Sequence, residues 1–196
     1  MEEKLTDQEI VRRQKVEKLK ELGVDPFGQA YERTSFSQDI RNAVLGKTHE
    51  EVETLNLEVS VAGRIMFIRK MGKASFFSIQ DIKGKIQIYI SINDVGEESY
   101  ALFKMADIGD IVGVKGRVMI TQTGEPTIKC LEYTHLTKAL RPLPEKFHGL
   151  SDIEERYRRR YVDLIMNEDA KKIAFTRPRI IRSIQHYLDS KNYVEV

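Results

Sequence analysis

The sequence predicts an α+β protein built around a small five-stranded β-barrel. Apolar residues recur at every second position from Val59 to Phe67, and again at 77–79 and 86–90, which is typical of strands with one buried face. Lys83 and Gly84 supply a tight hairpin between the last two of these strands. The content of 41% hydrophobic and 32% charged residues is that of a globular protein. The alternating apolar side chains, Phe67 included, are expected to fill the barrel core.

Helices are predicted before the barrel. Thr6 and Glu9 have the spacing of a capping box, so a helix should begin there and end near Leu22, before Gly23. Its apolar stripe is thin and consists of Ile10, Val16, Leu19 and Leu22. Its basic residues are Arg12, Arg13, Lys15, Lys18 and Lys20. Both a solvated surface helix and an arm that contacts phosphate groups fit this pattern. Shorter helices are expected at 37–45 and 48–56.

The order of the later elements specifies the barrel. After the third strand, residues 97–105 read as a short helix, 110–121 as a fourth strand and 126–136 as a fifth. Three strands, a helix and two strands is the order of an OB-fold, whose second and third strands carry the usual binding surface.

The outer face of those two strands holds an aromatic ring and an amide. Counting by twos places Phe76 and Ser78 on one strand, and Gln87 and Tyr89 on the next, away from the core. One interpretation is a stray half-exposed aromatic residue. The other is a platform for single-stranded nucleic acid, in which a ring stacks on a base and an amide reads its edge.

Helical segments follow the barrel. Residues 137–150 hold two prolines and are predicted to form an extended linker, after which Ser151 should cap a helix. A second helix is expected over 169–191, and Tyr193–Val196 should begin a strand. Because the chain ends inside that strand, we expect it to be a fragment.

Composition narrows the class of protein. The only cysteine, Cys130, lies in a predicted strand and has no partner for a disulfide, which fits a reducing compartment. No secretory signal and no apolar run of about 20 residues is present, so we expect a cytoplasmic protein without a membrane partner. The net charge is only +2, so any site for a polyanion depends on local clustering.

The sequence gives no sign of a catalytic or metal site. Residues 71–74 (MGKA) end like a phosphate-binding P-loop, but Phe67 replaces its first glycine and Ala74 its hydroxyl residue. The four histidines are scattered and lack the spacing of metal ligands. We therefore expect no catalytic residue and no bound metal.

Several segments together resemble one family. They are VAGRIM (61–66), MGKASF (71–76), DIGDIVG (107–113), KALRPLPEKFHGL (138–150) and RYRRRYVDL (156–164). This combination is similar to the amino-terminal part of bacterial class II lysyl-tRNA synthetases. The resemblance covers nearly the whole chain, and the long run at 138–150 is its most specific part. The OB-fold pattern alone would also suit aspartyl or asparaginyl relatives.

The resemblance implies a domain organisation and an activity. The expected domains are an N-terminal helical extension (1–56), an OB-fold anticodon-binding domain (57–136), a linker (137–150) and the incomplete start of a class II catalytic domain (151–196). Residues 177–196 resemble motif 1, through which the family forms homodimers. The full-length family is a lysine-tRNA ligase that uses ATP and Mg²⁺. Motifs 2 and 3 are absent here, so this chain should bind neither and should be inactive alone.

The resemblance also implies an RNA partner and a set of anticodon-binding residues. The partner is lysine tRNA with its uridine-rich anticodon, not DNA. The positions that match the family's anticodon readers are Arg69, Phe76, Gln87 and Glu125. A carboxylate at Glu125 would accept from the N3–H of uracil and repel the N3 lone pair of cytosine. Strict alternation puts Arg69 on the core side unless its strand ends or bulges there.

Two alternatives remain open at the level of sequence. A free-standing OB-fold could bind single-stranded RNA with no attached chemistry, but its chain should then stop soon after residue 136. An interaction module could use the motif 1 helix for dimerisation only, in which case a tight dimer would be indifferent to RNA.

Overall fold

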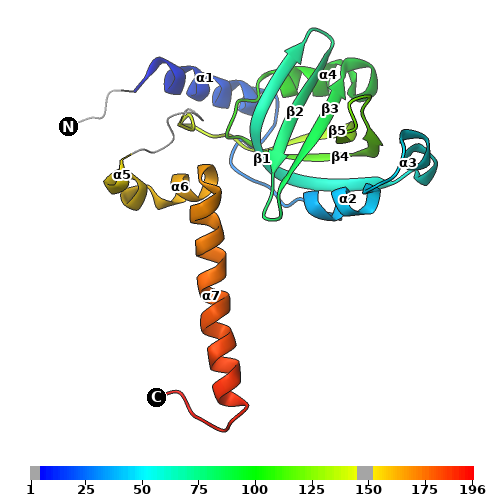
Figure 1. Cartoon of the computed structure of the whole chain (residues 1–196). Helices are drawn as coiled ribbons and strands as arrows, with labels where there is room; N and C mark the ends of the chain where they lie inside the picture. Colours follow the sequence, from blue (N-terminus) through cyan, green and yellow to red (C-terminus); the bar gives the residue numbers. More distant parts are fainter. Residues whose placement is uncertain (1–4, 145–151) are drawn as a thin grey trace. The chain divides into compact units, whose positions relative to one another are not determined.

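The computed structural model describes residues 5–144 and 152–196. Contacts divide the chain into two compact units, Met1–Pro142 and Leu143–Val196. The first unit holds a barrel with helices around it (Figure 1). Its helices are α1 (Asp7–Glu21), α2 (Ser37–Val44), α3 (His49–Leu55) and α4 (Ile92–Lys104). Its strands are β1 (Glu58–Met71), β2 (Ala74–Gln80), β3 (Lys85–Ser91), β4 (Ile111–Ile120) and β5 (Pro126–Thr137).

The five strands close into a barrel in the order β1-β2-β3-β5-β4. All neighbours are antiparallel except β3 and β5, which run parallel. The helix α4 intervenes between β3 and β4 in sequence, as the OB-fold requires. The prediction of a five-stranded OB-fold barrel is therefore confirmed.

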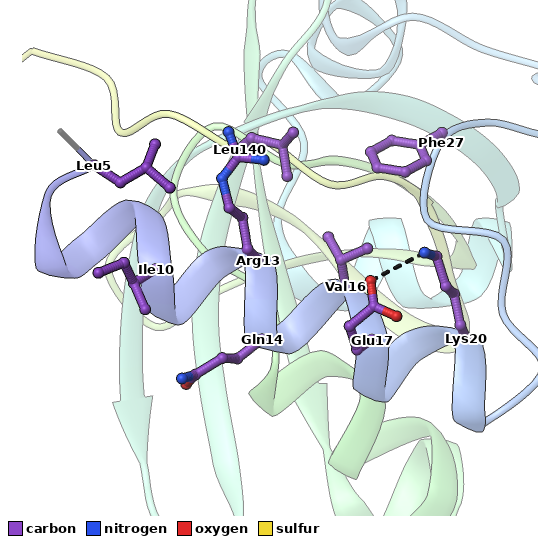
Figure 2. A pocket seen from close by; sticks show the side chains of 9 residues that line it. All are labelled: Leu5, Ile10, Arg13, Gln14, Val16, Glu17, Lys20, Phe27 and Leu140. Atoms are coloured by element: carbon purple, nitrogen blue, oxygen red, sulfur yellow. Dashed lines mark hydrogen bonds and ion pairs between the residues drawn. The ribbon is translucent and has the colours of Figure 1, made fainter. Parts of the chain in front are cut away.

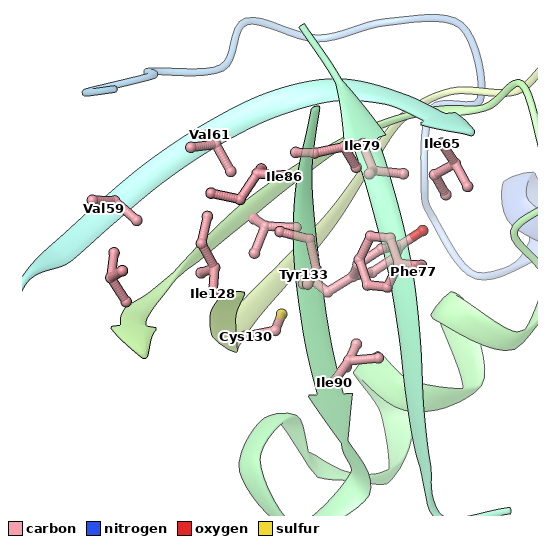
Figure 3. Close-up of a cluster of buried hydrophobic side chains, with 14 of the residues drawn as sticks. Val59, Val61, Ile65, Phe77, Ile79, Ile86, Ile90, Ile128, Cys130 and Tyr133 are labelled. Carbon is pink, nitrogen blue, oxygen red and sulfur yellow. The ribbon is translucent and has the colours of Figure 1, made fainter. Parts of the chain in front are cut away.

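The barrel core holds the alternating apolar residues of the predicted strands. Val61, Ile79 and Ile88 are at most 1% exposed, and Figure 3 shows such side chains from several strands pointing toward one another. The helix α4 adds Phe103, whose ring centroid lies 5.0 Å from that of Phe77. Burying one such side chain stabilises a fold by about 1.5–3 kcal/mol. This helix begins earlier than residue 97, and Gly96 interrupts it at a φ of 82°.

A β-bulge corrects the predicted position of Phe67. The register between β1 and β2 shifts between Ile65 and Phe67, so Met66 turns inward with 5% exposure and Phe67 turns outward with 47%. The shift lies where β1 passes from pairing with β4 to pairing with β2. The prediction that Phe67 fills the core is wrong because one extra residue reverses the alternation beyond it.

The helix α1 begins and ends as predicted. Thr6 and Glu9 form both hydrogen bonds of a capping box, and Gly23 follows the helix at a φ of 73°. The predicted stripe is only half right, because Val16 and Leu19 are buried whereas Ile10 and Leu22 are exposed. Arg12 is also buried, and it donates to the carbonyl oxygens of Ile108 and Ala139.

A buried polar cluster joins α1, the turn before β4 and the segment after β5. The Lys138 ammonium group, fully buried, lies 2.6 Å from Asp107 and 2.7 Å from Asp110. Asp110 also accepts from the backbone N–H of Ala139, and Asp107 pairs with Lys15 of α1 at 2.6 Å. The first residues of the predicted linker are thus anchored to the barrel.

The second unit consists of α5 (Ile153–Arg158), α6 (Arg160–Met166) and α7 (Glu168–Asp189). The predicted cap Ser151 lies outside the described residues, and Asp152 accepts from Glu154 N–H at the start of α5. The arginine cluster is paired with acidic groups: Arg156 and Arg160 with Asp163, Arg158 with Glu154, and Arg159 with Glu155. The helix α7 continues through Pro178.

The last residues correct a second prediction. Asn192 adopts the left-handed conformation after α7, with a φ of 62°. Tyr193–Val196 do not form the predicted strand, because no strand of the described part of the chain pairs with them. No helix within 5–144 or 152–196 is both long and apolar enough to cross a membrane.

We expect Lys138→Met to destabilise the barrel by about 3–5 kcal/mol, because it leaves the buried Asp110 carboxylate without its cation. Cys130 is fully buried, so the urea dependence of its labelling by a thiol reagent measures barrel unfolding. Lys115→Met breaks only an exposed pair with Glu132 and should cost at most about 1 kcal/mol. Equal effects of the two variants would show that the buried cluster is dispensable.

Asp107 should make this unit acid-sensitive. Burial raises the pKa of its carboxyl group, but hydrogen bonds from Lys138 and Lys15 outweigh that effect and hold the pKa below 3.8. A lowered folded-state pKa stabilises the fold above about pH 4 and loses that contribution as pH falls through the folded value. The difference in unfolding free energy between the unmodified protein and Asp107→Asn should therefore shrink from pH 6 to pH 3, as measured by urea unfolding. A constant difference would contradict this assignment.

Candidate nucleic-acid interface

A groove on the outer face of the barrel contains three of the four predicted site residues. Its volume is about 580 Å³, and Arg69, Phe76 and Gln87 line it. The remaining lining residues are His49, Phe67, Met119, Ile120, Thr121, Gln122 and Thr123. The groove thus runs over β1, β2 and β3 to the end of β4 and the loop before β5.

Strand register places the aromatic ring beside the cation. Arg69 of β1 pairs with Phe76 of β2, and Phe76 pairs with Tyr89 of β3. Arg69 is exposed on the outer face because the bulge at 65–67 reverses the alternation that would otherwise turn it inward. The structure therefore has the bulge that an outward Arg69 requires.

A chain of hydrogen bonds orients Gln87. Its Nε2 donates to the Thr127 hydroxyl at 2.9 Å, and that hydroxyl donates to the carbonyl oxygen of Glu125 at 3.1 Å. Thr127 is fully buried. One N–H of the amide is bonded to Thr127, which leaves its carbonyl oxygen and its other N–H for a ligand.

Glu125 closes the loop at the end of the groove but does not line it. The loop is tight because Thr121 N–H donates to Glu125 O at 3.1 Å, while Gly124 takes a φ of 82°. Arg41 of α2 pairs with the Glu125 carboxylate at 2.6 Å and donates to Lys85 O. The Glu125 side chain is 42% exposed, so it remains accessible from solvent.

This surface combines groups that bind unpaired bases. An aromatic face can stack on a base, an amide can donate to and accept from its edge, and a guanidinium can contact a phosphate. Among the residues that the structure describes, no group of three or more His, Cys, Asp or Glu could hold a metal ion. The ring, the amide and the guanidinium group together suit the groove to recognition of a single strand.

Comparison with known proteins identifies the relationship. A family model described as "OB-fold nucleic acid binding domain" matches residues 59–136, which include the whole groove except His49. Lysine–tRNA ligase from Lysinibacillus sphaericus is 54% identical over 194 residues, and those from Streptococcus thermophilus and Bacillus subtilis are 52% and 48% identical. Each match covers 99% of this chain. The chain is homologous to lysine–tRNA ligases.

The matches cover 39% of each of these lysine–tRNA ligases. The chain thus spans about two-fifths of the length of the relatives it matches. The recognition made from sequence motifs is confirmed, because the similarity extends over nearly the whole chain.

Sequence reasoning missed the seven other residues that line the groove, and three of them show why. Met119 could have been found, because alternation along β4 places it on the face opposite Val118. Phe67 could not, because residues 65–68 are all apolar and therefore hide the change of phase at the bulge. His49 comes from α3, where its Nδ1 lies 2.6 Å from Ile120 O at the end of β4, and only the tertiary fold brings it there.

A second hollow, of about 480 Å³, lies against α1 (Figure 2). Ile10 and Val16 of α1, Phe27 and Leu140 give it an apolar lining. Its one drawn polar contact joins two residues of the same helix, Lys20 and Glu17, at 3.0 Å. In the groove the ring, the amide and the cation lie on neighbouring strands, whereas this hollow takes its polar side chains from α1.

Proposed function

We propose that this chain recognises the anticodon of lysine tRNA on behalf of a lysine–tRNA ligase. The observation that carries the proposal is the single groove that gathers Arg69, Phe76 and Gln87, with the Glu125 loop at its end. The relatives' name adds the substrate class, since each is a lysine–tRNA ligase.

Each residue has a distinct role in the proposal. Phe76 stacks on one anticodon base, and Arg69 beside it contacts a carbonyl oxygen or phosphate. Gln87 presents an acceptor and a donor to a base edge from its fixed amide. Glu125 accepts from uracil N3–H through the carboxylate that Arg41 holds, and it disfavours cytosine.

The relatives are longer than this chain, and the proposal extends to a whole protein of their length. That protein forms lysyl adenylate with ATP and Mg²⁺ and transfers lysine to the tRNA, while residues 151–196 begin its catalytic domain. Its homodimer interface includes α7, whose exposed apolar residues at helical spacing are Ile173, Ile180, Ile184 and Tyr187. Neither ATP nor Mg²⁺ is assigned to residues of this chain.

The direct test compares two RNA stem-loops that differ only in the anticodon, UUU or CUC, at one stated salt concentration. We expect UUU to bind at least about tenfold more tightly, because one good polar readout contributes about 1–3 kcal/mol. Glu125→Gln should reduce this ratio while leaving the affinity for UUU within a few fold. Equal affinities of the unmodified protein for both loops would refute anticodon recognition by this chain.

Phe76→Ala should weaken binding of the UUU loop by about 1–3 kcal/mol, since it removes the stacking face. Phe76→Tyr keeps that face and is the matched control, expected to bind like the unmodified protein. Fluorescence anisotropy with labelled RNA measures both. Unchanged binding by Phe76→Ala would remove Phe76 from the site.

A further inference from the structure

A transverse row of side chains crosses the sheet, and its first two members, Arg69 and Phe76, line the groove. Register pairs Arg69 with Phe76, Phe76 with Tyr89, Tyr89 with Lys129, and Lys129 with Arg117. The row therefore crosses five strands on their outer face. Its sequence of groups is cation, two aromatic rings and two cations.

The two rings are neighbours on adjacent strands. Their centroids are 5.1 Å apart and their planes are inclined by 54°. Tyr89 therefore does not form a parallel stack on the face of Phe76. Tyr89 is half-buried, so part of its ring is open to a ligand.

The two cations beyond Tyr89 in the row are each in an ion pair. The Lys129 side chain is 43% exposed and lies 2.7 Å from Asp94, while Arg117 lies 3.1 Å from Glu58. The Lys129 ammonium group has three N–H donors, so its pair with Asp94 leaves it able to interact with a phosphate as well. Lys129 stands next to Tyr89 in the row, on the side away from Phe76.

We propose that Tyr89 is a second stacking platform, which takes the nucleotide adjacent to the one on Phe76, with Lys129 near its phosphate. Aromatic residues on adjacent strands of a sheet stack successive bases in other single-strand binders. The row contains no amide or carboxylate that could read a base edge beside Tyr89, since its other members are Phe76 and three cations. The Tyr89 position therefore adds affinity without selecting a base. This inference rests on the proposed function, because it assumes that the strand lies on Phe76.

The test uses Tyr89→Leu, which keeps an apolar side chain on the sheet, and Tyr89→Phe, which also keeps the ring. We expect Tyr89→Leu to weaken the UUU and CUC loops by the same factor of about ten, so that their ratio is unchanged. Tyr89→Phe should bind like the unmodified protein. A changed ratio, or an equal loss in Tyr89→Phe, would overturn the stacking role.

A second readout is specific to stacking. Stem-loops that carry 2-aminopurine on either side of the anticodon report stacking by loss of fluorescence, and the protein contains no tryptophan to interfere. One of the two RNAs should be quenched by the unmodified protein and by Tyr89→Phe at saturation, but not by Tyr89→Leu. Quenching that survives in Tyr89→Leu would refute the proposal.

Phe76→Ala separates this inference from the proposed function. If Phe76→Ala weakens binding and Tyr89→Leu does not, the second platform is wrong and the anticodon groove stands. If neither variant weakens binding, Phe76 is not in the site and the inference fails, while the comparison of UUU with CUC decides the proposed function.

Discussion

The β-bulge at residues 65–67 is the constraint on which both the barrel and its outer surface depend. The strand β1 pairs with β4 through its first half and with β2 through its second, and the bulge lies where one pairing gives way to the other. A bulge increases local twist and bend, which helps one long strand to pair with a different neighbour along each half and so to close the barrel. The same extra residue turns Phe67 and Arg69 outward. Closure of the barrel and the presence of Phe67 and Arg69 in the groove thus depend on one irregularity in the backbone.

Sequence alone predicted the parts of the fold that have a periodic signal. Alternation located the first three strands, and the Thr6 to Glu9 capping box located α1. The outward pair Phe76 and Gln87 followed from the same alternation. The bulge escaped because it changes the phase of the pattern without changing its composition, so Phe67 was assigned to the core. The strand expected at 193–196 failed for a different reason, since a strand requires a partner that periodicity does not supply.

Charge counting was equally limited along α1. Its basic residues fitted either a solvated face or a phosphate-binding arm, yet Arg12 and Lys15 attach the helix to the turn before β4 and to the segment after β5. These partners are about 90 to 130 residues away in sequence, at 107, 108 and 139. No local pattern distinguishes a buried arginine with carbonyl partners from an exposed one. Tertiary structure decides which charges remain for a polyanion.

The hydrogen-bond chain from Gln87 through Thr127 to Glu125 O has a direction. A hydroxyl group has a single proton, and Thr127 gives its proton to the carbonyl, so only a donor can approach it from the other side. The amide of Gln87 is therefore locked against a flip that would exchange its donor and acceptor ends. The polarity that the Gln87 amide presents to the groove is thus set by Thr127, which does not itself line the groove. A mutation at such a hidden position would free the Gln87 amide to flip while every side chain that lines the groove remained in place.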